Sequence, residues 1–248
     1  MDEATGTVVR EGVEAIVNPL DLYAIELGIR LREEHGGEVV VVSMGPSSAE
    51  EALREALAMG CDSAVLLTDR AFAGSDTWAT GYTLSSGIRK LGAFDLVICG
   101  ERATDGETGQ VGPGIAAFLG LPVATYVGGV EGVEGGEILV RRLVEDGYEV
   151  MGVQMPAVLT VVKEIADPRL PTLAGKRKSR TAKIEIWGPE DLDVEREKLG
   201  LAGSPTRVIK IFRPKLSREC RMIDALDESK VERGVEELVA FLKDKNLF

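Results

Sequence analysis

Short apolar runs that alternate with helix-length segments occupy the first 130 residues and restrict the fold more than any other feature. Each run is rich in β-branched or aliphatic residues, and glycines or N-cap residues separate it from its neighbouring helical segment. Continuous apolar runs are typical of strands buried on both faces of a parallel sheet. The pattern therefore predicts a doubly wound α/β core. Its strands are Val39–Ser43, Ala64–Thr68, Asp95–Cys99 and Val123–Val127, and its helices are Leu20–Glu34, Ser48–Met59, Thr77–Leu91 and Thr108–Leu119.

After residue 130 the pattern changes. Two extended runs, Ile138–Val144 and Tyr148–Met155, flank an acidic turn that ends in glycine, which predicts a β-hairpin. Ala157–Val162 predicts one more buried strand. The following segment, Lys163–Thr181, shows no apolar periodicity, and residues 169–183 carry six basic residues and no acid. We therefore expect a mostly parallel sheet with a hairpin and a protruding loop, which is either a solvated linker or a partner-docking loop.

The C-terminal part consists of a polar arm with prolines, Gly188–Met222, and an amphipathic helix, Glu228–Lys245. A helix with one apolar face and no core of its own must bury that face elsewhere. We therefore divide the chain into an α/β core, residues 1–187, and an arm with a helix, residues 188–248. The apolar helix positions recur at steps of three and four and are Val231, Val235, Leu238, Val239 and Leu242.

Composition excludes several classes of protein. The net charge of −12 argues against general nucleic-acid binding. No apolar run approaches the roughly 18 residues that a membrane helix needs, and the first residues lack the apolar segment of a signal peptide, so we expect a cytoplasmic protein without membrane insertion. One histidine and three unclustered cysteines predict no metal site. No set of catalytic residues stands out.

Three loops leave the carboxyl ends of predicted strands, which is where open parallel sheets bind ligands. Helix N-termini and glycines in such loops can hold a phosphate through backbone N–H groups. Each loop alone is also consistent with ordinary helix capping, because no dinucleotide or P-loop fingerprint is present. Together they favour an adenine-nucleotide site, in which the positive charge of Arg102 assists anion binding. The loops comprise Met44 and Gly45; Asp76, Thr77 and Thr80; and Gly100–Gly114, which enters the predicted Thr108 helix.

Four stretches carry a resemblance to a known family, and it extends from about Thr5 to the C-terminus. In the last of them, Arg142, Glu149 and Pro156 match a signature, although Met151 stands where the signature usually has Ile, Leu or Val. The chain resembles the β subunit of electron-transfer flavoproteins. The four stretches are Asn18–Asp21, Met44–Gly60, Gly100–Pro113 and Val140–Val161.

The resemblance implies an adenine-nucleotide α-hydrolase-like fold and a partner α subunit that carries FAD. Ordinary β subunits of the family bind AMP, whereas an electron-bifurcating subset binds a second FAD. Residues 76–84 and 105–113 resemble blocks of that subset, so the predicted cofactor is FAD, with AMP as the alternative at the same site. The implied cofactor-binding residues are Asn18, Met44, Gly45, Asp76, Thr77, Thr80, Gly100, Glu101, Arg102, Ala103, Asp105, Gly106, Glu107, Thr108 and Gln110.

The resemblance also implies the partners. Residues 161–181 correspond to the loop that docks an acyl-CoA or related dehydrogenase, with Leu173 as its anchor, and the C-terminal arm and helix pack on the α subunit. The family begins with a strand and a Lys-Gln-Val-Pro-like turn, which we expect to be missing here. We therefore expect an electron carrier between dehydrogenases and a downstream acceptor, with bifurcation from NADH in the two-FAD form. Any oxidoreductase activity then belongs to the αβ complex. A stand-alone adenine-nucleotide-binding module and a non-bifurcating form with structural AMP are the alternatives.

Overall fold

The computed structural model describes residues 16–104, 106–209, 222 and 227–246. The chain divides into two units, of which the first ends at Lys210 and the second begins at Ile211. The first unit contains every described strand, and each unit is described by itself below. Helix α7 (Glu228–Asp244) belongs to the second unit.

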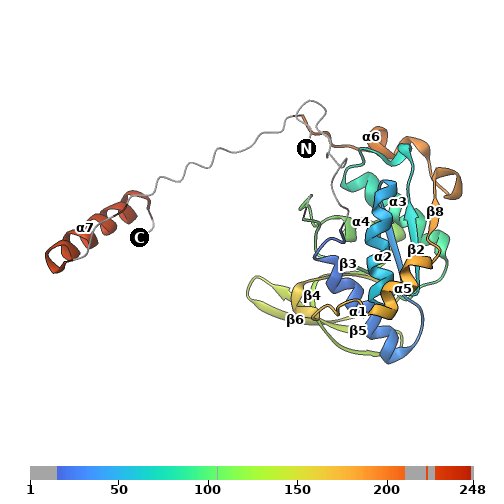
Figure 1. Ribbon diagram of the computed structural model, residues 1–248, viewed down its shortest axis with the longest axis horizontal. Helices are drawn as coiled ribbons and strands as arrows, with labels where there is room; N and C mark the ends of the chain where they lie inside the picture. The colour runs from blue at the N-terminus through green and yellow to red at the C-terminus, as the bar shows by residue number, and fades with distance from the viewer. Residues whose placement is uncertain (1–15, 105, 210–221, 223–226, 247–248) are drawn as a thin grey trace. The chain divides into compact units, whose positions relative to one another are not determined.

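A small parallel sheet has the strand order β1-β2-β8 (Figure 1). Strand β2 (Ser63–Leu67) is central, and it pairs with β1 (Val40–Met44) and β8 (Glu185–Trp187). The buried β2 side chains explain the apolar run in the sequence, because both faces of this strand are covered.

A larger, mixed sheet has the order β3-β7-β4-β5-β6. Strand β7 (Ala157–Val161) pairs in parallel with both of its neighbours and is entirely buried. The other strands are β3 (Leu96–Gly100), β4 (Val123–Glu134), β5 (Glu137–Val144) and β6 (Gly147–Gln154), of which β4, β5 and β6 pair antiparallel. The predicted α/β fold with a mostly parallel sheet and a hairpin is confirmed, and the strands form two sheets.

Helices cover both faces of these sheets. On one side, α1 and α2 bury Leu27, Ile29 and Leu53 in two apolar clusters; on the other, α3 and α4 bury Ile88 and Ile115 with β7. The helices are α1 (Asp21–His35), α2 (Glu50–Met59), α3 (Thr77–Leu91), α4 (Val111–Leu119), α5 (Leu173–Thr181) and α6 (Gly200–Gly203). Short 3-10 turns occur at Ser47–Ala49, Arg70–Phe72, Lys163–Ile165, Pro189–Asp191 and Arg196–Lys198.

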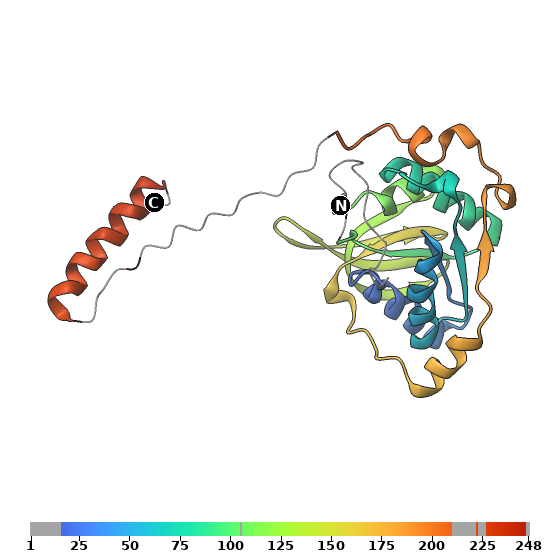
Figure 2. The same ribbon diagram turned by 45° about the horizontal axis from the view of Figure 1, so that its top comes forward.

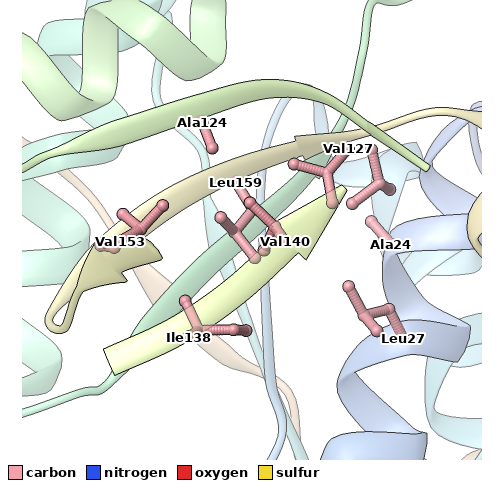
Figure 3. Close-up of a cluster of buried hydrophobic side chains, with 10 residues drawn as sticks. Ala24, Leu27, Ala124, Val127, Ile138, Val140, Val153 and Leu159 are labelled. Atoms are coloured by element: carbon pink, nitrogen blue, oxygen red, sulfur yellow. The ribbon is translucent and has the colours of Figure 1, made fainter. Parts of the chain in front are cut away.

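The core beneath α1 illustrates how the larger sheet is held (Figure 3). Ala24 and Leu27 on α1 lie over aliphatic side chains from β4, β5, β6 and β7. Burying one Val, Leu or Ile side chain contributes about 1.5–3 kcal/mol to folding. The hairpin strands therefore join the main core through Ile138, Val140 and Val153.

Strand β4 is longer than the sequence indicates. We expected it to end at Val127, but it continues to Glu134 along β5. Tyr126 has φ 56°, and the pairing register shifts here, so the strand bends as it passes from its parallel to its antiparallel partner. Pairing with β5 therefore extends the strand through Gly128 and Gly129, although glycine disfavours a strand.

The segment between β7 and β8 is more ordered than expected. Residues 162–184 cross from the larger sheet to the smaller one, and they include α5, whose contacts are mainly with α2 (Figure 2). Thr172 caps this helix by accepting a hydrogen bond from the N–H of Gly175 (2.9 Å). The helix has no apolar periodicity because nearly all of its side chains are exposed or half-buried.

The first part of the predicted C-terminal arm packs on the α/β core. Leu192 and Leu199 are buried with Trp187 and Tyr82, and the hydroxyl of Tyr82 accepts a hydrogen bond from the N–H of Glu195 (2.9 Å). The first unit therefore extends past residue 187, where the sequence placed the end of the core.

Helix α7 confirms the predicted amphipathic helix, with Asp227 as its N-cap. Val235, Leu238 and Phe241 are about half exposed. Among the described residues, no helix is long and apolar enough to span a membrane.

Candidate functional site

The start of α1 holds the loop that follows β3. The side-chain amide of Asn18 donates hydrogen bonds to the carbonyl of Arg102 and to Asp21 (both 3.0 Å), and its oxygen accepts one from the N–H of Thr104 (3.2 Å). Asp21 accepts a hydrogen bond from the N–H of Gly100 (2.7 Å). The predicted site residues Asn18, Gly100 and Arg102 are therefore brought together.

Gly100 is required at this junction by close backbone packing. A Cβ atom on Gly100 would lie 2.8 Å from the carbonyl oxygen of Leu20 and 2.9 Å from a carboxylate oxygen of Asp21. Any larger residue would push the start of α1 away from β3, and with it the side chains that hold the loop.

The N-terminus of α4 lacks a capping side chain. The helix starts at Val111 and not at Thr108 as we expected, because Glu107 (φ 52°) and Gly109 (φ 63°) adopt left-handed conformations that cannot belong to the helix. Gln110 occupies the N-cap position, and its side chain makes no capping hydrogen bond. Backbone N–H groups at such an end, together with the helix dipole, favour a phosphate.

The N-terminus of α3, in contrast, is capped from within the chain. One oxygen of Asp76 accepts a hydrogen bond from the N–H of Ala79 (3.0 Å), and the other accepts two from Thr206, at 2.9 and 2.8 Å. The N–H of Asp76 donates to the hydroxyl of Ser204 (2.8 Å). Asp76 therefore caps α3 and anchors residues 204–206.

The ionisation of Asp76 follows from these contacts. Partial burial raises the pKa of its carboxyl, but the hydrogen bonds from Ala79 and Thr206 outweigh burial, and the net pKa lies below the ordinary value. Asp76 is therefore charged at neutral pH. This negative charge disfavours a second phosphate at the N-terminus of α3.

Two threonine hydroxyls connect the loops after β2 and β3. Thr77 at the start of α3 and Thr108 before α4 lie with their hydroxyl oxygens 3.3 Å apart. The hydroxyl of Thr108 also accepts a long hydrogen bond from the N–H of Gln110 (3.5 Å). These two neutral donors therefore lie beside the open N-terminus of α4.

The side chain of Arg102, the cation expected at the site, is half exposed and lies near one carboxylate. Its Nε is 3.7 Å from an oxygen of Glu101, whose backbone N–H donates to the carbonyl of Val161 (3.0 Å). The loop closes on itself where the N–H of Glu107 donates to the carbonyl of Ala103 (2.8 Å). This loop therefore carries charged side chains, namely Glu101, Arg102 and Glu107, besides its exposed backbone and threonine hydroxyls.

The remaining predicted residues are placed as follows. Met44 and Gly45 lie at the carboxyl end of β1, where the N–H of Gly45 donates to the carbonyl of Leu67 (3.0 Å). Thr80 lies in the first turn of α3, and Gly106 is exposed, with open space around it. Asp105 lies outside the described residues.

Sequence reasoning missed three residues that shape the site, namely Asp21, Ser204 and Thr206. Asp21 follows Asn18 by three residues at the start of a helix, a signal that could have indicated its role. Ser204 and Thr206 are distant from α3 in sequence, and no local signal marks them.

Leu173, the predicted docking residue, is the first residue of α5 and is 83 % exposed. Leu170 is 88 % exposed. Lys176, Arg177 and Arg180 follow on the same short helix. An exposed apolar pair followed by cations is therefore present on this segment.

Burial disfavours the thiolate form of the two described cysteines, Cys61 and Cys99. Burial raises the pKa of the Cys61 thiol to about 11 and that of Cys99 to about 12. Cys99 Sγ lies 3.7 Å from the carbonyl of Leu159. Across the described ranges, no group of three or more His, Cys, Asp and Glu side chains is arranged to hold a metal ion.

The groups around the start of α4 could together hold a phosphate. The uncapped α4 terminus offers N–H donors, Gly106 leaves room for close approach, and the threonine pair adds hydroxyl donors. AMP and FAD both contain such a phosphate, so these groups alone do not distinguish the two nucleotides.

Known proteins are similar to this chain over most of its length. The family described as "Electron transfer flavoprotein domain" matches residues 5–192. "Electron transfer flavoprotein subunit beta" of Thermoanaerobacterium thermosaccharolyticum is 48 % identical over 96 % of this chain and 91 % of its own length. "Caffeyl-CoA reductase-Etf complex subunit CarD" of Acetobacterium woodii is 45 % identical over 100 % and 93 %, respectively. "Acryloyl-CoA reductase electron transfer subunit gamma" of Anaerotignum propionicum is 40 % identical over 94 % and 90 %. The chain therefore belongs to the electron transfer flavoprotein family, where its similarity is to the β subunits.

Proposed function

We propose that this chain is the β subunit of a heterodimeric electron-transfer flavoprotein that carries electrons between acyl-CoA dehydrogenases or related enzymes and a downstream acceptor. The observation that carries the proposal is the uncapped N-terminus of α4 beside a loop fixed by Asn18 and Asp21. The names of two relatives mention CoA-ester reductases, which supports a partner of that class.

We propose FAD as the nucleotide at this site. The N–H groups at the start of α4 would hold the phosphate nearest the adenosine, while Asn18 keeps residues 102–104 in place. Thr77 and Thr80 would contact the remainder of the cofactor. The carboxylate of Asp76 acts as a helix cap and not as a phosphate ligand. When bound, the flavin supplies electron transfer, in the bifurcating form from NADH. AMP is the alternative outcome.

The docking surface consists of Leu173 and its basic neighbours. Burying one exposed leucine in a partner contributes roughly 1.5–3 kcal/mol. The cations steer a partner with a carboxylate-rimmed apolar socket, since complementary charges raise association rates.

The α subunit covers the apolar face of α7. The half-exposed side chains Val235, Leu238 and Phe241 on that face supply the contact. Co-purification tests this contact: expression with the α subunit of the same organism is expected to give a 1:1 complex by size-exclusion chromatography. A well-folded β subunit that elutes as a monomer and does not bind the α subunit would contradict the proposal.

A further inference from the structure

An ion-pair cluster around the buried Glu26 fixes the segment before Leu173 to α1. Glu26 on α1 is only 2 % exposed. One of its carboxylate oxygens accepts hydrogen bonds from the backbone N–H (3.1 Å) and the Nε (2.8 Å) of Arg169. The other accepts from the Nε of Arg30 (2.6 Å) and from Nη2 of Arg169 (3.2 Å). The buried carboxylate is therefore fully paired.

Arg169 is held by a second carboxylate as well. Its two terminal nitrogens donate to the two oxygens of Glu33, at 2.6 and 2.9 Å, which is the parallel fork geometry that guanidinium and carboxylate groups prefer. Arg30 adds a long hydrogen bond to the carbonyl of Asp167 (3.4 Å). Both the side chain and the backbone of Arg169 are thus fixed on α1.

The charges of this cluster persist at neutral pH. Burial raises the pKa of the Glu26 carboxyl, but hydrogen bonds from Arg169 and Arg30 outweigh burial and lower the net pKa. The hydrogen bond from Arg169 likewise lowers the pKa of Glu33, and the two carboxylates raise the pKa of Arg169. We name Glu26, Glu33 and Arg169 the clamp.

The other end of the segment is fixed on α2. A Cβ atom on Gly175 would lie 2.1 Å from the carbonyl oxygen of Ala58, so α5 lies directly against α2 there. Arg54 on α2 donates a hydrogen bond to the carbonyl of Ser179. The exposed leucines, Leu170 and Leu173, therefore lie on a short stretch between two anchors.

We infer that the clamp positions Leu170 and Leu173, so that a partner dehydrogenase meets both side chains in one preformed arrangement. The inference rests on the proposed docking function. Arg169 directly precedes Leu170, and its backbone is already fixed by Glu26. The segment therefore has less conformational entropy to lose when a partner binds. Preformed segments bind more tightly because less ordering is needed. Arg169 is thus a positioning residue, because its own donors are engaged by α1.

The first experiment needs no partner. Trypsin must bind an extended arginine side chain to cleave after it. In the clamp, the Arg169 side chain is bound to Glu26 and Glu33 and is not available to the protease. In the αβ complex, Glu26→Gln is expected to raise the rate of tryptic cleavage between Arg169 and Leu170 about tenfold, with the melting temperature measured alongside. The matched control, Glu34→Gln, changes a mostly exposed carboxylate on the same helix and is expected to leave the rate unchanged. Equal cleavage in the wild type and Glu26→Gln would overturn the inference.

The second experiment measures docking. Steady-state reduction of the αβ complex by an acyl-CoA dehydrogenase of the same organism is followed as the concentration of the complex varies. Arg169→Gln is expected to raise the half-saturating concentration about tenfold, with the limiting rate and flavin content unchanged. Arg169→Lys is expected to restore part of the loss, because it keeps the charge.

A double-mutant cycle then separates the clamp from the docking surface. With Leu170→Ala and Leu173→Ala already present, Arg169→Gln is expected to have no further effect. If the two alanines weaken docking but Arg169→Gln alone does not, the clamp has no positioning role and the docking proposal stands. If the alanines themselves leave docking unchanged, both the docking proposal and the inference fail.

Discussion

Replacing Asn18 tests the geometry of the nucleotide loop most sharply. Asn18→Ala removes three hydrogen bonds, two to the loop backbone at Arg102 and Thr104 and one to Asp21. A net contribution of about 0.5–1.5 kcal/mol is typical of one such bond. Because these groups are exposed or half-buried and water can replace the lost partners, we take about 0.5 kcal/mol for each, or about 1.5 kcal/mol in all.

A loss of about 1.4 kcal/mol corresponds to a tenfold weaker equilibrium. If the loop must be ordered for binding, the dissociation constant of the nucleotide from the αβ complex rises about tenfold in Asn18→Ala. Calorimetric titration with AMP and with FAD, after the bound nucleotide is removed, measures this constant. The melting temperature of the nucleotide-free complex is expected to fall only slightly.

Asn18→Asp serves as the matched control. It keeps the oxygen that accepts from Thr104, loses the donor to Arg102, and places a second carboxylate beside Asp21. We expect binding at least as weak as in Asn18→Ala. Unchanged affinity in both variants would show that the loop after β3 does not form the nucleotide site.

Three other perturbations test single residues. Leu173→Ala is expected to slow electron transfer from a partner dehydrogenase at least tenfold without changing flavin content, as stopped-flow kinetics with the αβ complex would measure; unchanged rates would refute a docking role. Gly175→Ala should lower stability by about 1–3 kcal/mol, because its Cβ would meet the carbonyl of Ala58, whereas Gly114→Ala in α4 has open space and should be neutral or stabilising in thermal unfolding. The pKa of Asp76 is lower in the folded protein than in the unfolded chain, so its ionised carboxylate stabilises the fold. This stabilisation is complete above the unfolded pKa of about 3.9 and is lost as the pH falls through the folded pKa. Asp76→Asn is therefore expected to lower the melting temperature at pH 7 and to converge with the wild type in acid; a constant difference across that range would contradict the assignment.

The sequence predicted the helices and buried strands well, because their signals are local. The expected helix at Thr77–Leu91 agrees with α3 residue for residue, since Asp76 and Gly92 mark its ends. The expected strand Ala157–Val162 differs from β7 by one residue. Strands that are buried on both faces appear in the sequence as continuous apolar runs, which can be recognised without knowledge of distant residues.

Other features depended on partners distant in the sequence. The extension of β4 requires β5, and α5 forms against α2 although its own sequence carries no apolar stripe. The loops that carry Thr77 and Thr108 were placed in one site from the sequence, because strands of a parallel sheet direct their carboxyl ends to one edge. Asn18 was assigned to the same site only through the family resemblance. The use of Asp76 as an anchor for Thr206 was not predictable, since 130 residues separate them.

The nucleotide content of the αβ complex tests the central claim most directly. The purified complex is denatured, and the released nucleotides are separated by chromatography and quantified against the protein. The proposed function predicts two FAD per heterodimer, one from the α subunit and one from the site between Asn18 and α4. One FAD with one AMP would contradict FAD at this site, and a single FAD without any second adenine nucleotide would contradict the site itself.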